Sequence, residues 1–134
     1  MQEGVRKRIL VTDDEEDARE FVRAVLEDDF DIITASNGEE CLDMARREDP
    51  DLIILDVQMP VMGGIDVFVA LKKDDQLHHI PVIMLTGVRE KTGVGLSKEE
   101  MGDCFGEEPN DYLEKPLEPS LLYDVVCQCL GDRE

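Results

Sequence analysis

Short apolar runs alternate with amphipathic segments along this chain. The runs occupy residues 9–11, 32–35, 52–55 and 82–85, with a weaker run at 112–113. Apolar runs of this length between turn residues are typical of strands that are covered on both faces, as in a parallel sheet. We therefore predict five strands at these positions.

Four of the intervening or following segments have the spacing of an amphipathic helix, with apolar residues recurring on one stripe. These residues are Phe21, Val22, Val25 and Leu26; Cys41, Leu42 and Ala45; Ile65, Phe68 and Val69; and Leu121, Leu122, Val125, Val126 and Cys129. Strands that alternate with helices over short connections predict parallel strands, right-handed crossovers and helices on both faces. The predicted fold class is a doubly wound α/β fold with a five-stranded parallel sheet and nominally five helices.

The fourth helix is predicted to be short or irregular. The segment 87–110 contains glycine at positions 87, 93, 95, 102 and 106 and proline at 109, too many breakers for one uninterrupted helix. A capping-box pattern at Ser97 favours a short helix that ends near Phe105. We expect residues 88–96 to form a mobile loop. The glycine-rich segment 87–110 is then the variable part of a single domain spanning 1–134, with its core at 6–130.

The charge of the chain restricts its partners. There are 33 acidic and 14 basic residues, for a net charge of -19, so direct binding to nucleic acid or anionic lipid is disfavoured and a basic protein surface is the expected partner. The longest apolar run is residues 67–71, and no secretory signal fits the start, which predicts a cytoplasmic protein without membrane insertion. Four cysteines without a C-x-x-C spacing are read as reduced thiols that pack as small apolar groups.

Polar residues follow four of the predicted strands at their carboxyl ends. They are Thr12, Asp13 and Asp14 after the first, Asp56 after the third, Thr86 after the fourth, and Glu114, Lys115 and Pro116 after the fifth. In a doubly wound sheet these ends share one edge, where ligands bind beside the switch point in strand order. We therefore expect acids, a hydroxyl and an amine to meet there.

Three carboxylates in one place, those of Asp13, Asp14 and Asp56, repel one another. Two such charges about 4 Å apart cost on the order of 4 kcal/mol at an effective dielectric constant of about 20. A raised pKa, the Lys115 ammonium group or a bound divalent cation can offset that cost. Carboxylate oxygens without histidine or thiolate favour Mg²⁺, which also bridges phosphoryl oxygens, so the pattern indicates phosphoryl transfer.

Five motifs then resemble one known family. They are Ile9-Leu10-Val11-Thr12-Asp13-Asp14-Glu15, Asn37-Gly38-Glu39-Glu40, Pro50-Asp51-Leu52-Ile53-Ile54-Leu55-Asp56-Val57-Gln58-Met59-Pro60, Val82-Ile83-Met84-Leu85-Thr86 and Asp111-Tyr112-Leu113-Glu114-Lys115-Pro116. In this order they are similar to the bacterial response-regulator receiver domain, the family of the chemotaxis protein CheY. The resemblance covers residues 6–130 and implies the flavodoxin-like strand order 2-1-3-4-5.

The resemblance implies a role for each motif residue. Asp56 would accept a phosphoryl group, as an acyl phosphate, from a histidine kinase or phosphotransfer domain. Asp13, Asp14, Asp56 and the backbone carbonyl of Gln58 would hold Mg²⁺, with Asp14 as a direct ligand and Asp13 acting through water. Lys115, before a cis peptide bond to Pro116, would pair with the phosphoryl oxygens, and Thr86 and Tyr112 would form the switch.

Two features depart from the family pattern. Gly63-Gly64 stands where the family usually has Asp-Gly, which is expected to loosen that loop. Several extra residues separate Thr86 from Lys115, within the output face that the family builds from the fourth helix, the fifth strand and the last helix. This second departure puts a standard dimer and a standard choice of partner in doubt.

The predicted function is a phosphorylation-dependent switch that controls a protein target, with at most self-phosphorylation and self-dephosphorylation rather than enzymatic turnover. One alternative is a receiver-fold binding module that does not switch. Another is a receiver excised from a larger hybrid kinase or regulator, since the chain stops soon after Leu130. A phosphatase is disfavoured because its usual general acid would stand at Gln58. Taken singly, Asp13 or Asp14 could cap a helix, Lys115 could be a surface lysine and Tyr112 a core aromatic.

Overall fold

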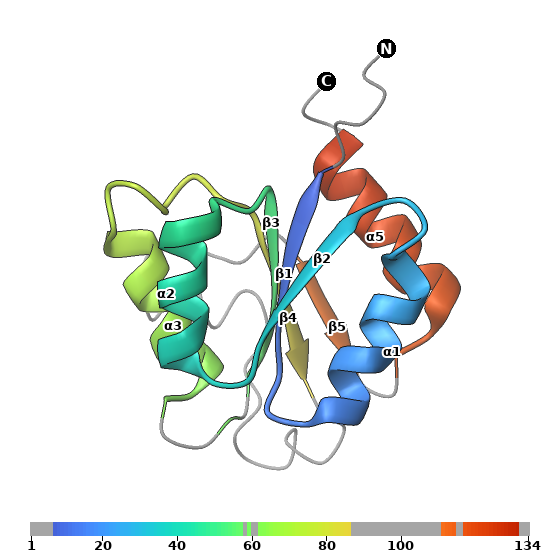
Figure 1. Ribbon diagram of the computed structural model, residues 1–134, viewed down its shortest axis with the longest axis horizontal. Helices are drawn as coiled ribbons and strands as arrows, with labels where there is room; N and C mark the ends of the chain where they lie inside the picture. Colours follow the sequence, from blue (N-terminus) through green and yellow to red (C-terminus); the bar gives the residue numbers. More distant parts are fainter. Residues whose placement is uncertain (1–6, 58, 60–61, 87–110, 115–116, 132–134) are drawn as a thin grey trace.

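The computed structural model describes residues 7–57, 59, 62–86, 111–114 and 117–131, and the predicted doubly wound α/β fold is confirmed there (Figure 1). The strands are β1 (Arg8–Thr12), β2 (Asp31–Ala35), β3 (Leu52–Asp56), β4 (Val82–Thr86) and β5 (Asp111–Glu114). The helices are α1 (Glu16–Leu26), α2 (Gly38–Glu48), α3 (Gly64–Lys73) and α5 (Pro119–Gly131). The predicted fourth helix and mobile loop lie outside the described residues.

The five strands form one parallel sheet in the order β2-β1-β3-β4-β5. β1 and β3 are neighbours near the middle, with Thr12 beside Leu55, and β3 pairs with β4 so that Asp56 lies beside Leu85. Every residue of β3 is buried. The carboxyl ends of these strands are therefore level with one another at one edge of the sheet.

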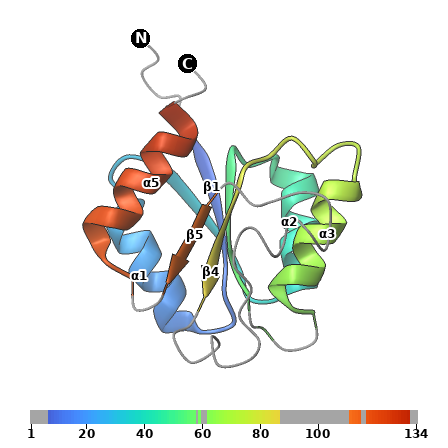
Figure 2. The ribbon, with the colours of Figure 1, turned by 180° about the vertical axis from the view of Figure 1, so that it is seen from behind.

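Each face of the sheet has its own apolar core. Leu10, Ile53, Leu55 and Met84 face α2 and α3, whereas Ile9, Val11, Leu52, Ile54, Ile83 and Leu85 face α1 and α5. Figure 2 shows the two helix pairs on opposite sides of the sheet. Successive residues of a strand point to opposite faces, so a strand between two cores must be apolar at every position, as the predicted runs at 52–55 and 82–85 are.

The start of α2 is held by three hydrogen bonds that involve side chains. The Asn37 side chain accepts a hydrogen bond from the Glu40 amide at 2.9 Å, and the Glu40 carboxylate accepts one from the Ser36 amide at 2.6 Å and one from its hydroxyl at 2.9 Å. These bonds from Ser36 hold the pKa of Glu40 below its ordinary value. Gly38 begins the helix, and an added Cβ would lie 2.7 Å from Val67 and 2.8 Å from Met62.

Asn37→Ala should lower the free energy of unfolding by about 1 kcal/mol, because the Glu40 amide loses its partner. Urea unfolding monitored by circular dichroism measures this change. Asn37→Asp is the matched control, since aspartate retains the accepting oxygen and should stay within about 0.5 kcal/mol of the wild type. Equal losses in both variants would contradict a capping role for Asn37.

The described cysteines pack in or against the apolar cores, as predicted. Cys41 is fully buried, and Cys127 and Cys129 are partly exposed, all three as free thiols. Burial raises the pKa of Cys41 to about 11, against a weaker opposite effect of the Thr12 hydroxyl, so this thiol stays protonated at neutral pH. His78 and His79 are exposed. Among the described helices, none combines the length and the apolar character needed to cross a membrane.

Candidate functional site

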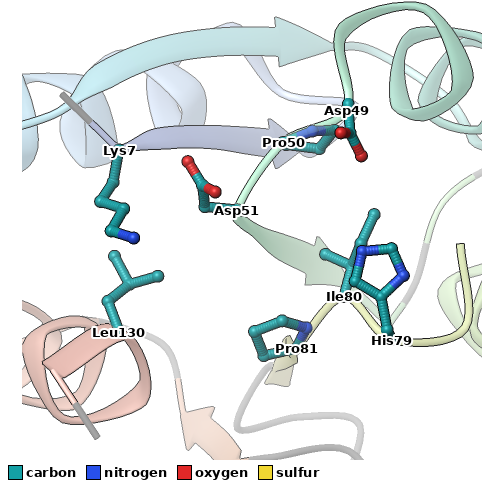
Figure 3. A pocket seen from close by; sticks show the side chains of 8 residues that line it. All are labelled: Lys7, Asp49, Pro50, Asp51, His79, Ile80, Pro81 and Leu130. Atoms are coloured by element: carbon teal, nitrogen blue, oxygen red, sulfur yellow. The ribbon is translucent and has the colours of Figure 1, made fainter. Parts of the chain in front are cut away.

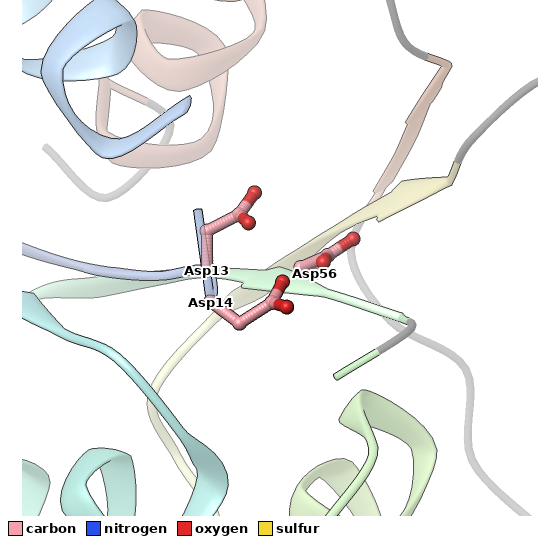
Figure 4. Close-up of side chains that lie close together, drawn as sticks. All are labelled: Asp13, Asp14 and Asp56. Carbon is pink, nitrogen blue, oxygen red and sulfur yellow. The ribbon is translucent and has the colours of Figure 1, made fainter. Parts of the chain in front are cut away.

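Three carboxylates gather at the carboxyl edge of the sheet. Asp13 and Asp14 directly follow β1, and Asp56 is the last residue of β3. Because β1 and β3 are paired in register, these residues are brought to the same level. One carboxylate oxygen from each of the three lies within 4.8 Å of the others (Figure 4). The expected convergence of Asp13, Asp14 and Asp56 is therefore present in the structure.

The three carboxylates differ in their access to water. Asp13 is fully buried and Asp56 is 3% exposed, whereas Asp14 is exposed. Two buried acids beside a third are costly unless positive charge or hydrogen bonds compensate them. A set of hard carboxylate oxygens at this spacing fits a Mg²⁺ ion, with Asp14 on the side open to solvent. The donor set therefore suits the cation that the sequence predicts.

The turn that carries Asp13 is tied down at three atoms. Its amide donates to the Ala35 carbonyl at 3.2 Å, and its Oδ1 accepts from the Glu15 amide at 3.0 Å. Its carbonyl oxygen accepts from Arg19 Nη1 at 2.8 Å. Asp13 thus braces the turn before α1 and does not cap the helix, whose N-cap residue is Glu15. Sequence reasoning missed Arg19, because an arginine on a predicted helix reads as a solvated residue.

The other side of the site is the contact between α3 and the end of β3. The Gly64 amide donates to the Val57 carbonyl at 2.8 Å. A Cβ on Gly64 would overlap the carbonyl oxygen of Asp56 and lie 2.8 Å from the Val57 Cα. The missing side chain of Gly64 lets α3 begin directly against the backbone of Asp56. Whether Gly63-Gly64 loosens the preceding loop stays a prediction.

The remaining predicted site residues are described in part or not at all. The backbone of Thr86 ends β4 beside Glu114, at the same edge as the acids, and the backbone of Tyr112 lies in β5 beside Met84. Gln58 and Lys115, with the predicted cis peptide to Pro116, lie outside the described residues. The roles predicted for the side chains of Thr86, Tyr112 and Lys115, and for the backbone carbonyl of Gln58, therefore stay predictions.

A cavity of about 150 Å³ lies at the opposite, amino edge of the sheet (Figure 3). It is lined by Lys7, Asp49, Pro50, Asp51, His79, Ile80, Pro81 and Leu130. Asp51 accepts a hydrogen bond from the Arg8 amide at 2.8 Å and so helps to join β1 to the start of β3. Because the cavity and the acidic cluster lie at opposite ends of the strands, the cavity is not part of the candidate site.

Comparisons with known proteins agree with this geometry. A family model described as the response regulator receiver domain matches residues 9–127. The chain is 33% identical over 127 residues to the polar-differentiation response regulator DivK of Brucella anthropi, covering 94% of this chain and 98% of DivK. It is 40% identical over 116 residues to the alkaline phosphatase synthesis transcriptional regulatory protein PhoP of Bacillus subtilis, covering 86% of this chain but 45% of PhoP.

Solved structures show the same similarity. The chemotaxis protein CheY4 of Vibrio cholerae superposes with a TM-score of 0.79 at 30% identity, covering 94% of this chain and all of that one. A receiver-domain protein from Clostridium thermocellum gives 0.78 at 27% identity, covering 95% and 96%. The chain therefore belongs to the receiver domains of two-component response regulators, a family of phosphorylation-dependent signalling proteins that interact with histidine kinases or phosphotransfer proteins.

Proposed function

We propose that this chain is a phosphorylation-dependent switch in which the Asp56 carboxylate accepts a phosphoryl group from a histidine kinase or phosphotransfer protein, with Mg²⁺ as cofactor. The observation that carries the proposal is the cluster of Asp13, Asp14 and Asp56, whose carboxylate oxygens lie within 4.8 Å of one another. Family membership supports phosphorylation-dependent signalling, and the cluster offers a carboxylate nucleophile together with oxygen ligands that suit the cation.

Asp56 is suited to act as the nucleophile. One of its oxygens attacks phosphorus, an O–P bond forms, and the P–N bond to the donor histidine breaks with its electron pair leaving on nitrogen. Asp13, Asp14, Asp56 and the backbone carbonyl of Gln58 would hold the Mg²⁺ ion. When bound, that ion would neutralise charge on the phosphoryl oxygens. The fixed backbone around Asp13 and Asp56 would keep the reacting groups in place.

Three further residues complete the proposal. The Lys115 ammonium group would pair with the phosphoryl oxygens after group transfer. The Thr86 hydroxyl would donate a hydrogen bond to the same phosphoryl group, and Tyr112 would change rotamer in response. The added charge would thereby alter the face formed by the fourth helix, β5 and α5, where a downstream protein target binds.

Because the phosphoryl group leaves Asp56 by hydrolysis once per phosphorylation, we assign no enzymatic turnover beyond self-phosphorylation and self-dephosphorylation. The net charge of -19 supports a protein partner over nucleic acid. We place the reaction in the cytoplasm, where nucleotide-dependent kinases supply phosphohistidine.

Acetyl phosphate with Mg²⁺ tests the proposal, since attack by Asp56 would release acetate and add one phosphoryl mass to the intact chain. We expect this mass gain in the wild type, and we expect its loss on chelation of Mg²⁺. Asp56→Asn is the matched control, because the amide has nearly the same shape but is not a nucleophile. A wild type that gains no mass, or an Asp56→Asn variant that gains it equally, would overturn the proposal in favour of a binding module that does not switch.

A further inference from the structure

Arg19 lies in α1, outside the acidic cluster, yet it reaches the backbone that carries two of the three acids. Its Nη1 donates to the Asp13 carbonyl oxygen at 2.8 Å in a partly buried contact. That oxygen belongs to the peptide group joining Asp13 to Asp14. Because a peptide group is planar and rigid, holding its oxygen orients the Cα atoms of both residues.

The amide and the side chain of Asp13 have other hydrogen-bond partners, so the contact of Arg19 acts on the peptide group between Asp13 and Asp14. The Asp13 amide is bonded to Ala35, and its side-chain Oδ1 is bonded to the Glu15 amide. Asp14 is exposed, so the direction of its carboxylate depends on the backbone beneath it. The Arg19 guanidinium group, held by a helix, therefore restricts the backbone of Asp14 before a ligand binds. The Asp14 carboxylate then loses less conformational entropy when it binds the ligand.

The charge of Arg19 acts in the opposite direction. A cation near the acidic cluster repels a second cation, so charge alone predicts that Arg19 weakens Mg²⁺ binding. Arg19 also contributes to holding the pKa of Glu40 low, after the hydrogen bonds from Ser36, so it lies near the Glu40 carboxylate as well. Positioning and charge therefore predict opposite signs for the loss of Arg19.

We propose that Arg19 is a positioning residue for the divalent-cation site: its hydrogen bond to the Asp13 carbonyl orients the Asp13–Asp14 peptide so that both carboxylates face the ion. This inference rests on the proposed function, which supplies the cation. Arg19 touches neither the ion nor the phosphoryl group, and its effect reaches the site through the backbone. The hydrogen bond outweighs the charge repulsion.

The test compares Mg²⁺ dissociation constants, measured by calorimetry on the full chain, for the wild type, Arg19→Met and Arg19→Lys. Methionine keeps much of the apolar stem but has no donor and no charge, and we expect it to weaken Mg²⁺ binding about tenfold. Lysine keeps a donor of similar reach and should restore most of the affinity. Arg46→Met is the matched control, because Arg46 pairs with Asp74 at 3.3 Å near the C-terminal end of α2 and is not part of the site.

Urea unfolding without Mg²⁺ separates positioning from a purely structural role. If Arg19 served stability alone, Arg19→Met would unfold more easily while its folded form bound Mg²⁺ as tightly as the wild type, and the inference would be wrong. Tighter Mg²⁺ binding by Arg19→Met would show that charge repulsion outweighs positioning, and this result would also overturn the inference. A wild type that binds no Mg²⁺ would instead remove the metal site of the proposed function, and the inference with it.

Discussion

A Gly64→Ala variant should lose about 3 kcal/mol of unfolding free energy and should accept a phosphoryl group more slowly than the wild type. The added methyl group would overlap the carbonyl oxygen of Asp56 and crowd the Val57 Cα. Both neighbours are backbone atoms of a strand end that is held in the sheet, so neither can give way as a flexible side chain can. Either α3 moves away or the end of β3 is displaced, and the second outcome also shifts Asp56.

Gly63→Ala is the matched control for this prediction. Gly63 has φ of -71°, which alanine adopts readily, and its added Cβ would lie 3.4 Å from the Val57 carbonyl oxygen, an ordinary contact. We expect its stability to stay within about 1 kcal/mol of the wild type. Urea unfolding gives the stabilities, and the rate of mass gain with acetyl phosphate gives the effect on Asp56. If the two variants behaved alike, the close approach of α3 to β3 would have no energetic role.

Asp14→Asn should weaken Mg²⁺ binding by roughly 10- to 100-fold, since it removes one of three negative charges grouped around the proposed ion. Asp14 is exposed, so solvent reduces the effect of its charge below that of a buried acid. Because the side chain is not packed into either core, the folded state should tolerate the substitution. Calorimetric titration with Mg²⁺ measures the affinity, and the rise in melting temperature at saturating Mg²⁺ provides a second reading.

Glu16→Gln serves as the control for Asp14→Asn. Glu16 is an exposed acid in the first turn of α1, and it is outside the acidic cluster. The control removes the same formal charge from the same region, so it measures the general effect of net charge on cation binding. We expect it to change the Mg²⁺ affinity less than threefold, a rough bound for exposed charges. Similar losses in the two variants would mean that Asp14 contributes only to a diffuse negative field.

The fold was predictable from the sequence because the local hydrophobic pattern of each strand matches its burial in the folded structure. The run at 52–55 is apolar at every position, and β3 is indeed buried on both faces between two helix layers. The acids were predictable for a related reason. Asp56 directly follows an apolar run and Asp13 follows one after Thr12, and the parallel arrangement of such runs brings their ends together.

The contacts that depend on a close approach in three dimensions were not predictable. The Gly63-Gly64 pair was expected to loosen its loop. In the structure Gly64 lies where the backbone of α3 meets that of β3, and no local sequence pattern shows which backbone will be near. Arg19 likewise looked like any charged residue of an amphipathic helix. Its role arises from the distance between α1 and the preceding turn, which follows from how α1 packs on the sheet.

The strand order places the three acids and the long connection at 87–110 on different strands of the sheet. The acids come from β1 and β3, whereas the long connection at 87–110 joins β4 to β5, the strand at the sheet margin farthest from β2. Insertions in that connection leave the register of β1 against β3 untouched. A lineage carrying this fold can therefore vary the length of this marginal connection while the strand pairing that holds the three acids together stays the same.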